Sequence, residues 1–384
     1  MRGFQFQTTP SILCESGASK RIGQLASDCR CRKVALVTDR GIVEAGLERP
    51  ALQGLAEAGV EAVMFDQVVA DPPQAMIEAM LAKARDARID GVVSVGGGSS
   101  LDCAKLVAVL CNSGQKLDDV YGIGMVRGGR LPLILAPTTA GTGSEVTPIA
   151  IVTTGKSEKK GVVSPQLLPD WAVLDPDLTL GLPAAVTAAT GVDAMVHAIE
   201  AYTSRHRKNP LSDALAREAL RLLGSNIRQA VSDPRNTEVR GAMLLGSMLA
   251  GMAFANAPVA AVHALAYPAG GHFHVPHGLS NALVLPHVLE YNMEGAAAEY
   301  AEIAPLAFAD LAGLAPVKAA AGMVEKFRAL GQELGMATRL REVGVSHNHL
   351  PMLAEGAMKQ TRLLVNNPRE MTLQAAQTIY EKAL

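Results

Sequence analysis

The stretch Gly91-Val92-Val93-Ser94-Val95-Gly96-Gly97-Gly98-Ser99-Ser100 decides how the first half of this chain folds. Its first five residues are mostly valine and apolar, which predicts a short buried β-strand. The glycines predict a tight turn into a helix that extends to Val109 and is capped by Ser99 or Ser100. Glycines before a helix N-terminus let the backbone approach an anion, but the same turn also forms without a ligand. The spacing matches neither the GxGxxG dinucleotide motif nor the GxxxxGK[ST] phosphate loop.

An alternation of strands and helices continues on both sides of this stretch. Further short strands are expected at 34–38, 60–65 and 131–136, and helices at 50–59 and 75–87. Such an alternation predicts a mostly parallel sheet with helices on both faces.

The composition changes near Pro183, where long segments rich in Ala, Leu and Met replace the strands, as at 211–231 and 240–254. Apolar residues there follow helical spacing, so we expect an all-helical second half. The chain should therefore form two domains, residues 1–182 and 183–384, with a cleft between them as the default ligand site.

The bulk properties of the 384 residues are those of an ordinary globular protein, with 49% hydrophobic and 19% charged residues. The net charge of -2 and only 4% aromatic residues give no basis for binding nucleic acid or an anionic membrane. Five cysteines without a paired CxxC framework favour reduced thiols in a cytoplasmic protein. The first residues lack the apolar core of a signal peptide, and the apolar run at 242–255 is too short and too broken by glycine to span a bilayer.

Two polar segments directly follow predicted strands. Asp39 comes after the strand at 34–38, where a carboxylate can hydrogen-bond an adenosine ribose and repel a 2′-phosphate, which favours NAD over NADP. The segment 137–145 places hydroxyls and glycines after the strand at 131–136, where they can contact phosphates or a nicotinamide ribose. Both segments also fit plain turns, in which the side chains hydrogen-bond only their own backbone.

Asp193 and His197 lie four residues apart in an apolar segment that is predicted to be helical. Residues i and i+4 project from the same face of a helix, so this pair can bind one ion. A buried carboxylate needs a partner, and a carboxylate with neutral imidazoles is a suitable ligand set for Zn²⁺ or Fe²⁺. A lone histidine on an apolar helix, however, is more often an ordinary core residue.

The remaining ligands must come from another part of the chain. The candidates in the segment 261–278 are His263, His272, His274 and His277. Pro268 is expected to end the helix that carries His263, after which a glycine-rich turn leads to a new helix just beyond His277. Spacing does not rank these histidines, and His206 and His287 are expected to be surface or structural residues.

Four motifs resemble those of the iron-containing (group III) alcohol dehydrogenases, and the similarity runs nearly from end to end. The motifs are GGGSSLDCAK at 96–105, TTAGTGSE at 138–145, GVDAMVHAIEAY at 191–202 and PHG at 276–278, with NPR at 367–369 adding to the likeness. Because the four motifs occur in the family's order, the match is specific at the level of the family.

The resemblance implies an α/β N-terminal Rossmann-like domain and an all-α C-terminal domain, the dehydroquinate-synthase-like architecture. It implies that the metal ligands are Asp193, His197, His263 and His277, with Fe²⁺ or Zn²⁺ as the ion. It also places the NAD contacts at Asp39, Asp71, Gly97, Gly98, Ser99, Thr138, Thr139, Thr147, Lys159 and Leu178.

Two positions depart from the family's pattern. Tyr267 stands where many members have a histidine beside the metal region, so the proton relay or substrate contact is expected to differ here. Asp71 stands where many members have an asparagine against the nicotinamide, and a carboxylate there would favour the cationic, oxidised cofactor. Phe254 and Tyr267 are predicted to line the substrate pocket.

The activity implied by the resemblance is the reversible oxidation of a small primary or secondary alcohol to its aldehyde or ketone. A homo-oligomer is expected, a dimer in the first instance. The alternatives are another reductase of the family such as maleylacetate reductase, a metal- and NAD-dependent lyase of the dehydroquinate synthase kind, or a nucleotide-binding protein with a structural metal. The few charges around the expected site argue against a highly anionic substrate.

Overall fold

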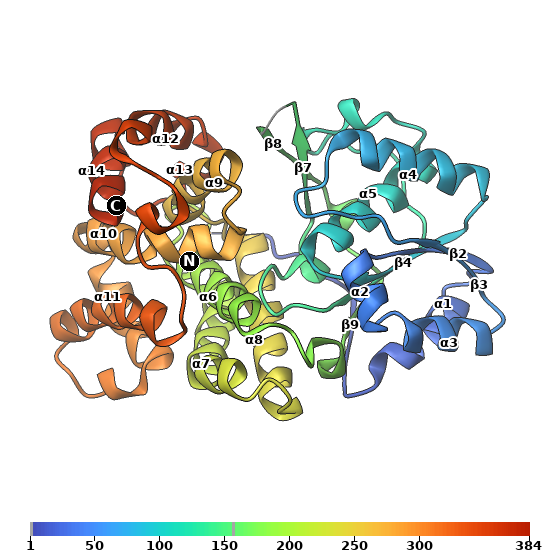
Figure 1. Cartoon of the computed structure of the whole chain (residues 1–384), viewed down its shortest axis with the longest axis horizontal. Helices are drawn as coiled ribbons and strands as arrows, with labels where there is room; N and C mark the ends of the chain where they lie inside the picture. The colour runs from blue at the N-terminus through green and yellow to red at the C-terminus, as the bar shows by residue number, and fades with distance from the viewer. Residues whose placement is uncertain (1–2, 156–157) are drawn as a thin grey trace. The chain divides into compact units, whose positions relative to one another are not determined.

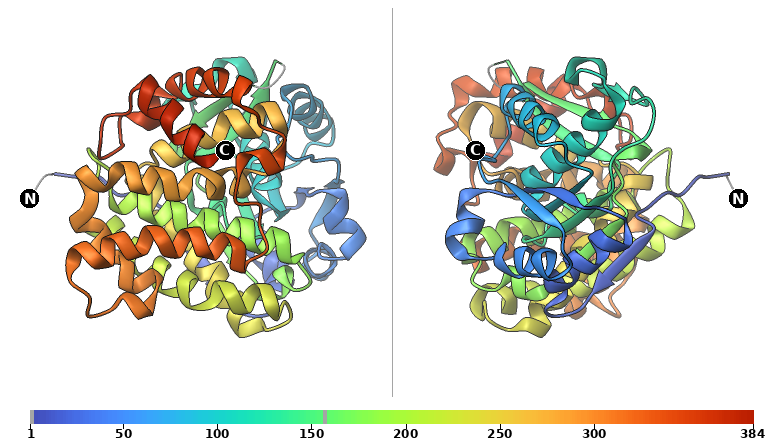
Figure 2. Two further views of the ribbon diagram at one scale, coloured as in Figure 1. Left: turned by 60° about the vertical axis from the view of Figure 1, so that its left-hand side comes forward. Right: turned by 90° about the vertical axis from the view of Figure 1, so that its right-hand side faces the viewer.

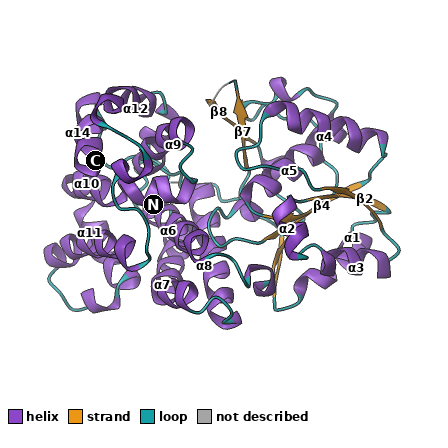
Figure 3. Cartoon of the chain, in the orientation of Figure 1, coloured by secondary structure: helices purple, strands orange, loops and turns teal. Residues whose placement is uncertain are grey.

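The computed structural model describes residues 3–155 and 158–384 of the chain (Figure 1). These residues form two compact units, one of residues 7–180 and one of residues 181–384 together with the first described residues up to Phe6. The first unit combines strands and helices, whereas the described residues of the second contain helices and no strand (Figure 3). The predicted fold class, an α/β domain followed by an all-α domain, is therefore confirmed.

A six-stranded sheet forms the centre of the first unit, and its neighbouring strands are all parallel. In order across the sheet, the strands are β1 (Ser11–Cys14), β9 (Trp171–Leu174), β6 (Leu133–Pro137), β4 (Gly91–Gly96), β2 (Lys33–Val37) and β3 (Glu61–Phe65). The four strands predicted from apolar runs are confirmed as β6, β4, β2 and β3, which lie side by side. The strands β1 and β9 have four residues each, too short a run to be recognised from periodicity.

Helices cover both faces of this sheet. They are α1 (Ile22–Asp28), α2 (Arg40–Ala45), α3 (Arg49–Glu57), α4 (Gln74–Asp86) and α5 (Gly98–Ser113). Successive residues of a strand point to opposite faces, so β2 contributes to two separate cores. Ala35 and Val37 pack in the core that α4 and α5 complete, whereas Val34 and Leu36 pack in the core of α1 and α3. The sheet is thus buried on both sides, as parallel sheets usually are.

A second, three-stranded sheet lies in the same unit. It consists of β5 (Gly122–Ile123), β8 (Glu158–Val163) and β7 (Ile149–Thr154), with β7 and β8 antiparallel. Ala150, Val152 and Val162 belong to the same apolar core as α4 and α5. This small sheet therefore extends the core on the α5 side of the unit.

The second unit is built from long helices. They are α6 (Ala184–Tyr202), α7 (Pro210–Ser232), α8 (Thr237–Asn256), α9 (Ala261–Phe273), α10 (His277–Ala307), α11 (Pro316–Glu333), α12 (Leu350–Met358), α13 (Thr361–Leu364) and α14 (Leu373–Ala383). The predicted helical segments 211–231 and 240–254 are confirmed as α7 and α8, and α11 packs along α10 (Figure 2). Taken singly, none of the described helices has both the length and the apolar character needed to cross a membrane, while α8 and α9 meet that test only as a pair bent by 106°.

Pro268 lies inside α9, so the prediction that it ends this helix is wrong. A proline removes one helical hydrogen bond and crowds the preceding turn, a cost that packing has to offset. The Pro268 ring packs against α12, where a Cβ at Gly356 would come within 3.1 Å of it. The helix continues past its glycines to Phe273, and its C-cap residue His274 has a left-handed φ of 54°. His263 is therefore held on one uninterrupted helix of the second unit.

Candidate active site

Helix α6 supplies the first two candidate ligands, Asp193 and His197. Both lie on its buried side, where Asp193 is 2% exposed and His197 is 5% exposed. Nearly the whole C-terminal two-thirds of this helix is buried, so the carboxylate of Asp193 has lost its contact with water. A carboxylate in that position needs compensating partners within the protein or from a bound cation.

A close approach of α10 to α6 brings His277 to this carboxylate. His277 is the first residue of α10, and Gly278 follows it. A Cβ at Gly278 would lie 2.2 Å from the backbone oxygen of Ala189 and 3.3 Å from the Cβ of Asp193. Only glycine allows the two backbones to come this close, so Gly278 determines the distance between the ligands on α6 and α10.

The side-chain donor atoms of Asp193, His263 and His277 all lie within 4.8 Å of one another. Asp193 Oδ1 is 3.7 Å from His263 Nε2 and 3.6 Å from His277 Nε2. His197 Nε2 lies 3.0 Å from His263 Nε2. Ligands about 2.1 Å from a tetrahedral ion would be about 3.4 Å apart, so the spacing of Asp193, His263 and His277 fits one divalent cation, while His197 is not part of the group within 4.8 Å. The rival candidates His272 and His274 are exposed at the end of α9, outside this group.

Glu200 is a buried partner of the cluster that the sequence motif contained without revealing its role. Its Oε2 lies 2.7 Å from Nδ1 of His263, and its Oε1 accepts a 2.7 Å hydrogen bond from the backbone N–H of Val262. A carboxylate at Nδ1 keeps the proton there and leaves the Nε2 lone pair directed at the cluster. Residues 193, 197 and 200 follow an i, i+4, i+7 spacing, which is the signal that places all three on one face of α6.

Asn281 is a second buried partner of the cluster. Apart from its position four residues after His277 on α10, nothing in the sequence indicates this role. Its Nδ2 donates to Asp193 Oδ1 at 2.6 Å and lies 3.3 Å from Nε2 of both His263 and His277. Its Oδ1 is buried without a hydrogen-bond partner in the described part of the chain. The amide therefore holds the Asp193 carboxylate and contacts both imidazoles.

In this cluster, the acidic and basic side chains each favour the charged form of the other. Burial raises the pKa of Asp193, but the neighbouring histidines and the hydrogen bond from Asn281 outweigh burial, so the pKa of this carboxyl is lowered. Burial lowers the pKa of His263, but the hydrogen bond and the charge of Glu200 outweigh it, so the pKa of this imidazole is raised. Asp193 is consequently ionised at neutral pH, as a cation ligand must be.

Two aromatic side chains border the cluster. The Phe254 ring stacks on His197 with the ring centres 4.3 Å apart, and the Tyr267 ring lies 5.8 Å from that of His277. Phe254 is 8% exposed, so it presents an apolar surface to the imidazole with little access for water. The predicted role of both residues in a substrate pocket stays a prediction.

In the α/β unit, the glycine turn has the predicted strand–turn–helix form. Gly97 is the N-cap of α5 and has no side-chain cap, so the prediction that Ser99 or Ser100 caps the helix is wrong. The helix begins one or two residues earlier than those serines, which lie within its first turn. A Cβ at Gly98 would lie 2.8 Å from the Thr142 side chain, so this loop closes tightly over the turn.

Asp39 and Thr138 lie beside the glycine turn because they follow the neighbouring strands β2 and β6. Asp39 Oδ1 accepts a 3.1 Å hydrogen bond from the N–H of Ile42 and caps α2, while its Oδ2 would be 3.8 Å from a Cβ at Gly96. The backbone N–H of Thr138 donates to the Gly96 carbonyl at 3.0 Å. The carboxyl ends of parallel strands are the usual ligand edge of such a sheet.

The other predicted cofactor residues have varied surroundings. A Cβ added at Gly97 would lie 3.8 Å from the Thr139 side chain. Thr147 accepts a 3.2 Å hydrogen bond from Lys105. Lys159 forms an ion pair with Asp71, whose φ of 55° is left-handed. Leu178 is buried in the apolar core of α1 and α3, and its backbone N–H donates to the Asp175 carbonyl at 3.1 Å.

A parallel α/β unit with a glycine turn at its ligand edge, followed by a helical unit with an Asp/His cluster, defines a metal-containing class of dehydrogenase. Two family models match the chain, iron-containing alcohol dehydrogenase over residues 9–176 and the C-terminal part of the Fe-containing alcohol dehydrogenase family over residues 187–384. The chain belongs to the iron-containing alcohol dehydrogenase family, as an alcohol–aldehyde oxidoreductase.

Full-length relatives agree with this assignment. The chain is 39% identical to a 1,3-propanediol dehydrogenase of Klebsiella pneumoniae over 92% of this chain and 91% of that protein. It is 31% identical to an NAD-dependent methanol dehydrogenase of Bacillus methanolicus over 99% of each. The crystal structure of a 1,3-propanediol oxidoreductase superposes with a TM-score of 0.96 at 36% identity, covering 100% of both chains.

Proposed function

We propose that this protein interconverts a small primary or secondary alcohol and its aldehyde or ketone, with NAD(H) as the hydride carrier and one divalent ion at the cluster. The observation that carries the proposal is the group of ligand atoms from α6, α9 and α10 within 4.8 Å of one another. Relatives named as dehydrogenases of 1,3-propanediol and methanol support the reaction class and differ in their substrate. Small alcohols are therefore the first substrates to test.

The ligand set proposed for the ion is Asp193, His197, His263 and His277. A divalent ion held there supplies Lewis-acid chemistry, which makes an alcohol easier to deprotonate and a carbonyl easier to reduce. One carboxylate and three imidazoles suit either Fe²⁺ or Zn²⁺. Glu200 and Asn281 would keep His263 and Asp193 in the orientation that binding needs.

The aromatic residues have proposed roles at the same cluster. Phe254 would exclude water from the face of His197 on which it stacks, which favours hydride transfer over side reactions. Tyr267 would contact the substrate beside His277. A phenol gives up its proton less readily than an imidazolium, so Tyr267 acts as a hydrogen-bond donor rather than as the relay that a histidine would provide.

In the α/β unit, the proposed NAD contacts are Asp39, Asp71, Gly97, Gly98, Ser99, Thr138, Thr139, Thr147, Lys159 and Leu178. The N-terminus of α5 would hold the pyrophosphate, because its first N–H groups have no partner within the helix. The Asp39 carboxylate beside Gly96 would repel a 2′-phosphate, which supports NAD over NADP. The Lys159–Asp71 ion pair leaves less positive charge for the cofactor than a free lysine would.

The absorbance of NADH at steady state tests the proposal directly. Metal-reconstituted protein should oxidise NADH when it is mixed with short aldehydes such as propanal or 3-hydroxypropanal. A lyase that uses NAD transiently would leave the NADH concentration unchanged with every aldehyde and ketone. That second result, obtained with protein shown to hold one ion per chain, would contradict the proposed function.

A further inference from the structure

The helical unit contains a polar cavity that none of the four proposed metal ligands lines. Its volume is about 230 Å³, and its walls come from α6, α10, α11, the segment after α11, and α14. A water molecule needs about 10–15 Å³ of such space, so the cavity has room for a small organic molecule. The residues that carry the inference are Arg328, Arg339, Lys382, His287, Leu283 and Phe327.

Positive charge dominates the polar part of this cavity. Arg328 and Lys382 share one carboxylate, that of Glu290, at 2.8 Å and 3.1 Å, and Arg328 also pairs with Glu325. Arg339 has no ion-pair partner among the residues that the structure describes. Three cations thus face two carboxylates, and the guanidinium of Arg339 is left to bind an anion.

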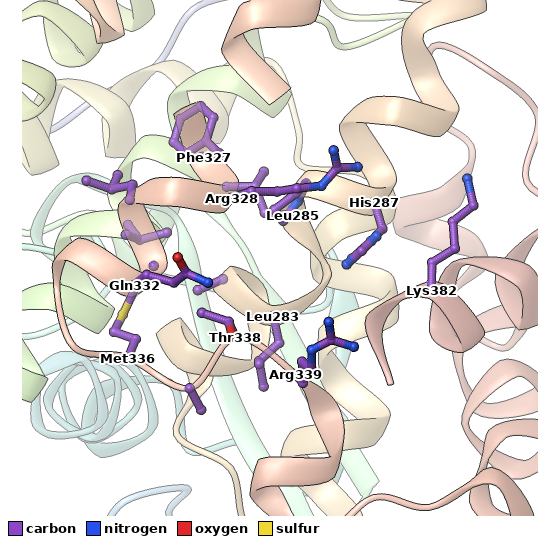
Figure 4. Close-up of a pocket in the computed structure, with 16 residues that line it drawn as sticks. Leu283, Leu285, His287, Phe327, Arg328, Gln332, Met336, Thr338, Arg339 and Lys382 are labelled. Atoms are coloured by element: carbon purple, nitrogen blue, oxygen red, sulfur yellow. The ribbon is translucent and has the colours of Figure 1, made fainter. Parts of the chain in front are cut away.

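His287 lies between these cations, with Arg328 and Arg339 on opposite sides of its ring (Figure 4). Its Nδ1 is buried and has no hydrogen-bond partner among the described atoms. Burial and the charge of Arg328, together with Lys382 and Arg339, lower the pKa of His287 to about 4, despite the opposing charge of Glu290. An anion beside the ring would offer an acceptor for the imidazole N–H and would offset the surrounding positive charge.

The rest of the cavity wall is mostly apolar, with Gln332 and Thr338 as its polar members. Leu283 and Phe327 are 1% and 4% exposed, and Leu285 and Met336 complete this side of the cavity. A bare inorganic anion would leave such a surface without contacts, because it carries no apolar part to bury against it. A ligand with a charged head and a short hydrocarbon tail satisfies both halves of the cavity.

We propose that this cavity binds a small amphipathic carboxylate, with its head between Arg328, Arg339 and His287. A planar carboxylate matches the fork of a guanidinium, which favours arginine over lysine as its principal partner. The tail packs against Leu283 and Phe327. None of the four proposed metal ligands lines this site, although Val192, the residue before Asp193, forms part of its wall.

Isothermal titration calorimetry of the metal-loaded full chain with hexanoate tests the site. We expect one hexanoate per chain, with hexanamide and inorganic phosphate each binding about tenfold or more weakly, because the first lacks the charge and the second lacks the tail. Arg339→Gln should weaken hexanoate binding about tenfold or more. Arg235→Gln removes another exposed arginine elsewhere in the unit and should leave binding unchanged.

Nuclear magnetic resonance of the histidine rings gives an independent readout. Hexanoate should shift the His287 resonance, which is assigned by its disappearance in His287→Gln, and should raise the pH at which that ring titrates. Absence of saturable binding, equal affinity in Arg339→Gln and Arg235→Gln, or an unshifted His287 resonance would each overturn the proposal. Phosphate binding as tightly as hexanoate would overturn the assignment to an amphipathic carboxylate.

Discussion

Oε2 of Glu200 lies 2.7 Å from Nδ1 of His263, and both side chains are buried. The carboxylate also accepts the backbone N–H of Val262, so it is fixed at both oxygens. His263 therefore turns its Nε2 toward the cluster, where it lies 3.7 Å from Asp193 Oδ1 and 3.0 Å from His197 Nε2. The orientation of one imidazole on α9 is thus determined by a carboxylate on α6, and several predictions about metal affinity depend on it.

Replacing Glu200 should weaken metal binding without removing a ligand. We expect Glu200→Ala to lower the affinity for Zn²⁺ or Fe²⁺ about 100-fold and Glu200→Gln about tenfold, because the amide keeps an acceptor for Nδ1–H but loses the charge. Competition with a chelator, followed by metal analysis of the protein, measures both. Glu218→Ala, an exposed carboxylate on α7, serves as the control and should bind like the unaltered protein. Equal affinities in all three variants would show that His263 needs no orienting partner.

Adding one methyl group at Gly278 should disrupt the contact between α10 and α6. In Gly278→Ala the Cβ would meet the Ala189 carbonyl at 2.2 Å, so we expect a loss of about 3 kcal/mol or more in the free energy of unfolding. Gly270→Ala is the matched control, because the nearest atom to its Cβ lies 3.4 Å away. Chemical denaturation should show this control within about 1 kcal/mol of the unaltered protein. Similar losses in both variants would mean that the close approach at Gly278 does not hold the helices together.

Coenzyme preference should respond to the charge of Asp39. Asp39→Ser keeps a side chain that can cap α2 and removes the carboxylate that opposes a 2′-phosphate. We expect the ratio of kcat/KM with NADPH to that with NADH to rise about tenfold, a change of about 1.4 kcal/mol. Arg40→Ser, the neighbouring residue, should instead leave the ratio unchanged or lower it. An unaltered ratio in Asp39→Ser would show that this carboxylate does not determine the coenzyme preference.

Stability at acid pH should depend on His287. Its pKa is about 4 in the folded protein and about 6.5 in the unfolded chain, so the unfolded state takes up a proton first as the pH falls. The stabilisation is therefore complete above pH 6.5 and is lost as the pH falls from about 6.5 to about 4. His287→Gln cannot titrate and should lose less stability across this window, by on the order of 1 kcal/mol. Parallel stability curves for the two proteins would contradict the lowered pKa.

The sequence indicates the parts of the fold that repeat a local pattern. The apolar runs of β2 and β4 and the periodic helices α7 and α8 are predictable because burial of one face imposes the same spacing along the whole element. The four-residue strands β1 and β9 escape prediction because they are stabilised by their neighbours in the sheet. The local chemistry of Pro268 predicts a helix end, whereas its packing against Gly356 keeps α9 intact.

Prediction of the candidate metal site from the sequence meets the same limit. The spacing of Asp193 and His197 predicts a shared face of α6, but no spacing chooses His263 and His277 over the neighbouring histidines. That choice comes from the resemblance to a family and from the convergence of α6, α9 and α10. Asn281 acts through a contact to a residue 88 positions away, which no local pattern encodes.

Metal content measured beside NADH oxidation tests the proposed site most directly. Unaltered protein, reconstituted with Fe²⁺ or Zn²⁺, should hold one ion per chain and oxidise NADH with a short aldehyde. His263→Ala should hold less than about a tenth of that metal and show no turnover, because the cluster loses one ligand and the partner of Glu200, while it still binds NADH by fluorescence titration. Full turnover by metal-free His263→Ala protein would contradict the role of this cluster.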